Sequence, residues 1–484
     1  MSARLALGGI GLSPVLVAVA FVLIGFVNNA VPLDQLSRPL LLALGVALAV
    51  EAVAVLALGW VRGSFWAFVV VSGLAGLFIL AGAAVLALTL FGIVAQAPER
   101  QHRLGGLLAT GVGMALVAVM VVTGAARGAF DWRPINLAAP DIGPLEAGPS
   151  IHLLLLDAYP REDILAELDF DNGPFLTAMA DRGFDDYPQS RSNYDRTPFS
   201  LLTMLTLRHL GDIEELDGAD AAGDAAEQQR VAGRALLGVP LFDLVEEAGY
   251  RTRVVDGPVV HAPLGGADEV TSAGSATNFE LDTLQRTPLA APLEALGIGM
   301  DQARSQVTGS LALFADPPEG PSFTFTHVMA PHAPFSFEAD GSVVPAPPCY
   351  PDTCAIFDGQ DEGLGWSEEE HWSRVIGHVT HLNDLVLEAV DRLLAADAEA
   401  VIVVFGDHGM RVPGDPANIH RNLLLARTPG HPGLFGEAPT LVNVVPHLLN
   451  AYLGADAALL PDDLFQASDD PWFEALPFRS AGSP

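Results

Sequence analysis

The sequence predicts an α/β domain, with a largely parallel sheet flanked by helices, that follows an N-terminal bundle of transmembrane helices. Three continuous apolar runs, at residues 151–156, 322–329 and 401–405, have the length and composition of strands buried on both faces. A long amphipathic pattern precedes the last run, and four apolar stretches lie before residue 130. A helix followed by a buried strand is the order expected of a parallel sheet covered by helices.

The four apolar stretches run roughly over residues 13–31, 39–60, 64–95 and 105–125. Each is long enough to cross a hydrocarbon core of about 30 Å, which takes about 20 helical residues. The third stretch has room for one tilted helix or two short ones, so five spans are the alternative to four. Glu51 lies within the second stretch, where a carboxylate is a candidate functional group, and a protonated Glu buried between helices is the alternative.

The charge of the chain is divided unevenly. Residues 1–130 have a net charge of +3 and the remainder has −37, and all 24 basic side chains are Arg. A domain this acidic repels polyphosphate, so no nucleic-acid partner is expected. An anionic substrate would need local cations to overcome the same field, and a divalent metal supplies them well.

The arginines do not orient the predicted spans, because equal numbers fall on the two sides. The acidity of the large domain indicates a location outside the cytoplasm. The close spacing of Cys349 and Cys354 agrees, because it suits a small disulfide in an oxidising compartment, with free thiols as the alternative. We expect a multi-pass protein of the cell membrane, with the bilayer as a partner and the large domain extracytoplasmic.

The expected division of the chain is into four parts: a transmembrane region at 1–128, a Pro-rich linker at 129–150, a large domain at 151–455 and a C-terminal tail at 456–484. Within the large domain, Ser367 and Glu370 form a capping box, and apolar residues then recur at three- and four-residue spacing as far as Leu393. This pattern predicts the long helix before the run at 401–405. Residues 210–300 are polar and rich in Ala and Gly, and no element is predicted there.

Polar side chains follow two of the predicted strands directly. Asp157 comes after the run at 151–156, and Asp407 and His408 come after the run at 401–405. In open α/β sheets, ligands gather at the carboxyl ends of the strands. Two carboxylates and an imidazole suit zinc or manganese, with magnesium or calcium as alternatives. Gly409 is expected to permit the sharp turn that follows.

Thr197 precedes Pro198 and a segment that predicts a helix. It is therefore expected at the N-cap, beside the unsatisfied backbone N–H groups and the partial positive charge of the helix end. An alkoxide, or a phosphoryl or sulfuryl group under attack, would be stabilised there. An ordinary capping threonine is the alternative.

Two histidines and an arginine complete the candidate site. His332 stands in a loop stiffened by prolines and could protonate a leaving alkoxide or bind the transferred group. His420 is a second candidate for contact with substrate or metal. Arg421 beside it could pair with an anionic headgroup, with a solvated loop charge as the alternative. His327, within the strand predicted at 322–329, is interpreted as a core histidine.

Four segments occur in the order LLLLDAYPR, SNYDRTPFSLLTML, THVMAPHAPFSFEADG and VIVVFGDHG. They resemble the successive blocks of the sulfatase-like branch of the alkaline phosphatase superfamily. The chain is similar to membrane-bound members such as lipoteichoic acid synthases and lipid A phosphoethanolamine transferases. The resemblance covers about residues 150–450 and implies an alkaline phosphatase-like sheet. It also implies a nucleophile at Thr197, substrate contacts from His332 and His420, and a metal held by Asp157, Thr197, Asp407 and His408.

The chain departs from this pattern at two positions. Sulfatases convert a Cys or Ser to formylglycine within a Cys/Ser-x-Pro-x-Arg pattern, whereas Thr197 and Leu201 occupy the corresponding positions here. Formylglycine is therefore excluded, which disfavours ordinary sulfate-ester hydrolysis. The first acidic position is often Glu in the transferases and is Asp157 here, which leaves the choice of metal open.

The sequence thus predicts a membrane-anchored, metal-dependent enzyme of the sulfatase family whose active site lies outside the cytoplasm. It would transfer or hydrolyse a phosphoryl-linked group through Thr197, with an anionic lipid headgroup or an envelope glycan as substrate. One alternative is a sulfate- or phosphate-ester hydrolase of the same superfamily. The other is a catalytically silent envelope protein that uses the fold for binding.

Overall fold

The computed structural model describes residues 12–58, 60–74, 99–219, 224–257, 262–274, 276–285, 298–344, 367–412, 415–468, 471 and 473–478. The chain divides into two units. One comprises Met1–Trp132 with Thr277–Leu296, and the other comprises Arg133–Ala276 with Gly297–Pro484. Cys349 and Cys354, and with them the expected disulfide, lie outside the described residues.

The first unit is helical. Its helices are α2 (Ser13–Asn28), α3 (Ser37–Leu58), α4 (Trp60–Leu74), α6 (Glu99–Ala126) and α12 (Asn278–Gln285), with a 3-10 turn at Leu33–Leu36. In the described part of the chain, two helical segments, Leu33–Leu58 and Leu107–Ala126, are long and apolar enough to cross a membrane. The number of four spans stays a prediction, because only the described residues bear on these two segments. Helix α2 has 16 residues, fewer than the 20 or so that a span needs, and residues 75–95 of the third stretch lie outside the described residues.

In the first unit, large apolar side chains are exposed, whereas a polar pair is buried between helices. Leu56 of α3 is 87% exposed and Val122 of α6 is 68% exposed. Glu51 of α3, by contrast, is buried and accepts a 2.9 Å hydrogen bond from the hydroxyl of Ser64 in α4. The Glu51 carboxyl therefore lies between two helices, as the packing alternative predicts.

The second unit contains a seven-stranded sheet in the order β2-β7-β6-β1-β5-β3-β4. Strand β1 pairs in parallel with β5 and β6, β3 pairs in parallel with β4 and β5, and β7 runs antiparallel to β6 and β2. The strands are β1 (Ile151–Leu156), β2 (Asp185–Asp186), β3 (Arg251–Asp256), β4 (Glu269–Ser272), β5 (Ser322–Val328), β6 (Val401–Phe405) and β7 (Leu424–Arg427). The predicted α/β class and its three buried strands are confirmed.

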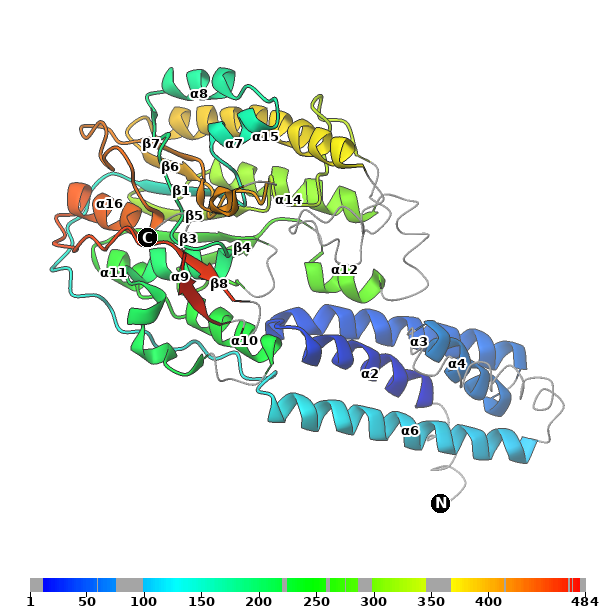
Figure 1. The fold of residues 1–484 in the computed structure, drawn as a ribbon. Helices are drawn as coiled ribbons and strands as arrows, with labels where there is room; N and C mark the ends of the chain where they lie inside the picture. The colour runs from blue at the N-terminus through cyan, green and yellow to red at the C-terminus, as the bar shows by residue number, and fades with distance from the viewer. Residues whose placement is uncertain are drawn as a thin grey trace. The chain divides into compact units, whose positions relative to one another are not determined.

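Helices cover both faces of this sheet (Figure 1). Alternate residues of β1 point to opposite sides, with Leu153 in one core and Leu154 in the other. The first core is closed by α9 (Thr197–Thr206), α10 (Ala225–Leu236), α11 (Leu241–Glu247) and α16 (Val444–Tyr452). The second is closed by α7 (Glu162–Glu167), α8 (Gly173–Ala180), α14 (Ile298–Phe314) and α15 (Glu368–Ala396). The carboxyl ends of the central strands thus open at one edge of a three-layer domain.

The long predicted helix is α15. The hydroxyl of Ser367 accepts a 3.1 Å hydrogen bond from the backbone N–H of Glu370, which confirms the predicted cap. Residues 210–300, where no element is predicted, contain α10, α11, α12, β3 and β4. Strand β3 shows why its pattern is hidden: Arg251 and Arg253 interrupt its apolar residues, and their side chains keep some exposure near the edge of the sheet.

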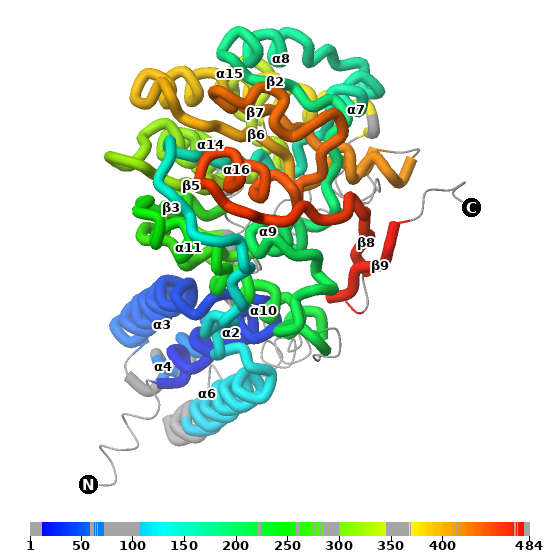
Figure 2. Tube along the Cα trace, turned by 90° about the vertical axis from the view of Figure 1, so that its left-hand side faces the viewer, coloured from blue at the N-terminus to red at the C-terminus, as the bar shows by residue number. Residues whose placement is uncertain are grey.

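The C-terminal segment, expected as a tail, forms the two-stranded sheet of β8 (Phe465–Ala467) and β9 (Ala475–Pro477) (Figure 2). It is tied to the segment before α9: Phe465 N donates to Asn193 O at 2.7 Å, and Ala467 N donates to Asp195 Oδ1 at 2.8 Å. Further 3-10 turns lie at Leu210–Asp212, Glu214–Leu216, Pro416–His420 and Leu441–Asn443.

Candidate metal centre and nucleophile

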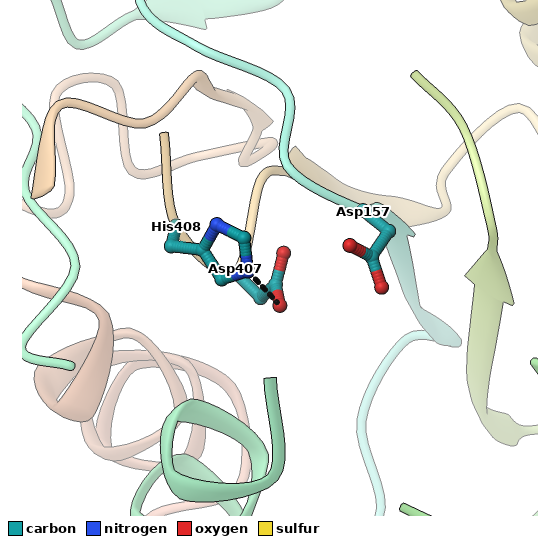
Figure 3. Close-up of side chains that lie close together, drawn as sticks. All are labelled: Asp157, Asp407 and His408. Atoms are coloured by element: carbon teal, nitrogen blue, oxygen red, sulfur yellow. Dashed lines mark ion pairs between the residues drawn. The ribbon is translucent and has the colours of Figure 1, made fainter. Parts of the chain in front are cut away.

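The candidate site lies at the carboxyl ends of the neighbouring strands β1 and β6. Asp157 follows β1, and Asp407 and His408 follow β6. One ligand atom from each of these three buried side chains lies within 4.8 Å of the others (Figure 3). The structure therefore brings together three of the four predicted ligands at one point.

The fourth, Thr197, is close by: its Oγ1 lies 3.5 Å from His408 Nε2. The prediction that it caps α9 is wrong, because Thr197 is the first helical residue and Arg196 occupies the cap position. The backbone N–H groups of Phe199 and Ser200 donate to the Arg196 carbonyl at 3.1 and 3.0 Å. These donors are satisfied by backbone, so the Thr197 hydroxyl is left to face His408.

Two tight backbone features hold the site in shape. Ala158, directly after Asp157, has a φ of 60°, a conformation rare outside Gly, and its N–H donates to Asp407 Oδ1 at 3.0 Å. At Gly409, a Cβ would lie 2.5 Å from the Asn418 carbonyl oxygen and 2.6 Å from that of Arg421. The reason for Gly409 is thus the close approach of another backbone segment, which replaces the sharp turn predicted from the sequence.

The two carboxylates each keep an oxygen without a hydrogen-bond donor. Asp157 Oδ2 accepts a 2.8 Å hydrogen bond from His327 Nε2, whereas the buried Oδ1 has no donor among the described residues. Asp407 Oδ2 is likewise buried without a donor in the described part of the chain. Buried anionic oxygens without partners are costly, and a cation would satisfy both.

His408 presents its lone pair to the same point. Its Nδ1–H donates to the Gly409 carbonyl at 2.8 Å, so in the neutral ring Nε2 carries the lone pair. This nitrogen lies 3.4 Å from Asp407 Oδ2. Burial lowers the pKa of His408, but the charges of Asp407 and Asp157 raise it, so the two carboxylates attract positive charge to this point. A divalent cation held by oxygen and imidazole ligands would supply that charge, and the backbone bond of Nδ1 is typical of metal-binding histidines. The donor set therefore fits a metal.

His332 and His420 are held in the same tautomer as His408. His332 Nδ1–H donates to the Ala333 carbonyl at 2.8 Å, and its backbone N–H donates to the Asp157 carbonyl at 3.0 Å. The buried His420 donates Nδ1–H to the Ser192 carbonyl at 3.0 Å. Each ring therefore keeps Nε2 as the atom able to accept a proton or bind an electrophile.

The surroundings of the site favour an ionised Asp157 carboxylate and the neutral rings of His332 and His420. Burial alone would raise the pKa of Asp157, but the charge of His332, the hydrogen bond from His327 and the charge of His408 lower it to about 2. Burial lowers the pKa of His332, against the opposing effect of Asp157. Burial likewise lowers the pKa of His420. Near neutral pH the neutral forms of these two rings are favoured.

Sequence reasoning missed the role of His327. It is buried, as predicted for a core histidine, but it also donates to the candidate ligand Asp157. In the parallel register of β1 and β5, Leu155 pairs with His327. This register sets the His327 side chain beside that of Asp157, which directly follows β1. The apolar runs predicted both strands but carried no information on their register.

Arg421 is engaged by acidic side chains. Its guanidinium lies 3.1 Å from Asp415 and 3.4 Å from Asp163. The contact of Arg421 with an anionic headgroup stays a prediction. To bind a headgroup, the guanidinium would have to leave these carboxylates.

No family model matches the chain, and no curated protein matches it. Solved structures similar to it include the C-terminal periplasmic domain of EcEptC from Escherichia coli in complex with Zn, with 13% identity over 68% of this chain and 93% of that one, at a TM-score of 0.41. Lipoteichoic acid synthase LtaP from Listeria monocytogenes is 13% identical over 66% of this chain and 77% of that one, with a TM-score of 0.36. The soluble domain of lipooligosaccharide phosphoethanolamine transferase A from Neisseria meningitidis is 16% identical over 65% of this chain and 90% of that one, with a TM-score of 0.38.

The fold and the site define an α/β protein with a buried cluster of metal-ligating side chains at the carboxyl edge of its sheet. The roles of individual residues rest on the distances given above.

Proposed function

We propose that this chain is a membrane-anchored, metal-dependent enzyme that transfers or hydrolyses a phosphoryl-linked group outside the cytoplasm. One observation carries the proposal: Asp157, Asp407 and His408 converge within 4.8 Å, and a Thr hydroxyl lies 3.5 Å from the imidazole of His408. A hydroxyl beside such a ligand cluster is the arrangement expected of an activated nucleophile.

Asp157, Asp407 and His408, with Thr197 Oγ1, would hold the metal, and zinc or manganese suits this set better than magnesium or calcium. When bound, the cation would neutralise charge on the non-bridging oxygens of the substrate and favour the alkoxide form of Thr197. Asp157 Oδ1 and Asp407 Oδ2, which have no hydrogen-bond partner among the described residues, support this assignment.

The protein groups would then carry out the transfer. Thr197 Oγ1 forms a bond to phosphorus while the bond from phosphorus to the leaving oxygen breaks. The hydroxyl proton passes to His332 Nε2, which favours the neutral form and can accept it, and then to the leaving oxygen. In the second half, the oxygen of water or of an acceptor alcohol forms a bond to phosphorus, the bond from phosphorus to Thr197 Oγ1 breaks, and the proton of the attacking group passes to Thr197.

The apolar helices of the first unit support membrane anchoring. Two helical segments among the described residues have spanning length, and their exposed apolar side chains suit lipid. A site tethered in this way would meet headgroups at the bilayer surface. An anionic lipid headgroup or an envelope glycan is therefore the proposed substrate.

The test compares Thr197→Val with Thr203→Val, a matched change elsewhere in α9 where the hydroxyl donates to the Phe199 carbonyl. Full-length protein in detergent, loaded with zinc or manganese, is assayed on phosphodiester, phosphomonoester and sulfate-ester substrates. We expect Thr197→Val to lose turnover by at least about 10³-fold and Thr203→Val to keep it within a few-fold. Turnover retained in Thr197→Val would reject the nucleophile.

The same assay separates the alternative functions. Added acceptor alcohols increase product if the enzyme transfers the group and leave it unchanged if water is the acceptor. Preference for the sulfate ester would support the sulfatase alternative. Absence of bound metal after purification with zinc present, together with no turnover, would support a silent binding protein.

A further inference from the structure

A small pocket adjoins the candidate metal centre. Its volume is about 40 Å³. Three residues of its wall border the centre: Ala158 follows Asp157, Gly409 follows His408, and His332 is the third. A group in this pocket would therefore lie beside the centre.

The rest of the wall is largely apolar and aromatic. It includes Phe335, Trp372, Val375, Met410 and Ile419. Arg411 is the side chain with a permanent charge among the described residues that line it. Its side chain is 39% exposed, so the guanidinium lies near solvent, in the loop that follows His408.

The position of Arg411 meets an electrostatic need. The chain has a net charge of −34, so an anionic substrate must find local positive charge. Arg411 lies 3.8 Å from the buried Asp195, whereas Arg421 has three acidic neighbours, at 3.1, 3.4 and 4.0 Å. Of these two arginines, Arg411 is the one that lines the pocket.

We propose that this pocket binds the first atoms of the ester group of a phosphodiester monoanion, and that Arg411 binds its negative oxygen. This inference rests on the proposed function, which places the phosphorus atom of the substrate at the metal centre. It assigns to Arg411 the anion contact that the sequence suggested for Arg421. A volume of about 40 Å³ holds roughly three water-sized groups, so the pocket takes a small ester group.

The experiment measures binding calorimetrically, with full-length protein in detergent and dimethyl phosphate as probe. Neutral trimethyl phosphate, similar in shape, is the control ligand. The variants are Arg411→Ala, Arg411→Lys and Arg421→Ala, with Arg182→Ala as a control of equal charge change. Arg182 pairs with Asp391 on the exposed side of α15, away from the pocket.

We expect Arg411→Ala to weaken binding of dimethyl phosphate by at least about tenfold, because it removes a charge-assisted hydrogen bond. Arg411→Lys should recover part of the loss, and Arg182→Ala should bind as wild type. Binding of trimethyl phosphate should not respond to Arg411.

Three results would overturn the inference: no binding of dimethyl phosphate to the wild type, equal binding by Arg411→Ala, or a loss in Arg421→Ala alone. The last result would restore the assignment made from the sequence. The binding assay involves no turnover, so it is separate from the Thr197 test. Binding that does not depend on Arg411 rejects this inference, and activity in Thr197→Val rejects the proposed nucleophile.

Discussion

His327 Nε2 donates a 2.8 Å hydrogen bond to Asp157 Oδ2, and neither side chain has any exposed surface. The bond occupies one carboxylate oxygen and leaves Oδ1 for the candidate metal centre. Burial would lower the pKa of His327, but the hydrogen bond and charge of Asp157 raise it. The pair therefore fixes both the orientation and the charge of the carboxylate.

We predict that His327→Leu weakens zinc affinity by about 10- to 100-fold, as expected when the partner of a metal ligand is lost. His327→Gln, whose amide can donate to Asp157, should recover part of the affinity. The measurement is competition with a chelating dye. His152→Gln serves as control, because this buried histidine of β1 bonds to Thr324 instead. Equal affinity in His327→Leu and the wild type would show that Asp157 needs no such partner.

The room for the His327 ring depends on Gly257. A Cβ at this position would lie 2.3 Å from His327 Nδ1 and 2.6 Å from its Cγ. We predict that Gly257→Ala displaces the ring, lowers stability by about 1–3 kcal/mol and reduces zinc affinity. Gly211→Ala is the matched control, because a Cβ there meets no atom of the described residues within 4 Å. Urea unfolding and zinc titration of the two variants provide the comparison, and identical behaviour would contradict the prediction.

Metal binding should stabilise the folded protein. A metal at 100 times its dissociation constant adds about 2.7 kcal/mol to the free energy of unfolding if it binds only the folded chain. We predict a higher midpoint of thermal unfolding with zinc than with a chelator. Asp407→Asn should abolish the difference, and Asp384→Asn, an exposed change on α15, should preserve it. A zinc-induced shift that persists in Asp407→Asn would locate the metal elsewhere.

The stability of the domain should also depend on pH. Burial lowers the pKa of His378 to about 3, with a further contribution from the charge of His381. The folded state therefore binds this proton less readily than the unfolded state, in which the pKa is about 6.5. The stabilisation is complete above about pH 6.5 and is lost as the pH falls toward 3, at about 1.4 kcal/mol per pH unit.

We predict that His378→Gln reduces the slope of unfolding free energy against pH between pH 6 and 4. Urea unfolding in the presence of a chelator measures the slope for wild type and variant. The buried His152, whose pKa burial lowers to about 4, contributes a similar slope in both proteins. A variant with the slope of the wild type would show that His378 is protonated in the folded state.

The core of the site was predictable because its signals are local. A run of apolar residues followed at once by a carboxylate marks the end of a buried strand, and this located Asp157, Asp407 and His408. The cap of Ser367 was predictable for the same reason, since its partner lies within one helical turn. Strand β3 was not predicted, because charged residues interrupt its apolar pattern.

The sequence by itself determined which strands are buried, which polar residues end them and the acidic charge of the whole chain. Only the tertiary structure decided which side chains meet. His327 reaches Asp157 through the register of two parallel strands. Arg411 lines the pocket while Arg421 turns to acidic neighbours. Hydrophobic periodicity follows from the burial of each segment, whereas partners distant in sequence depend on strand register and side-chain direction, which no local pattern records.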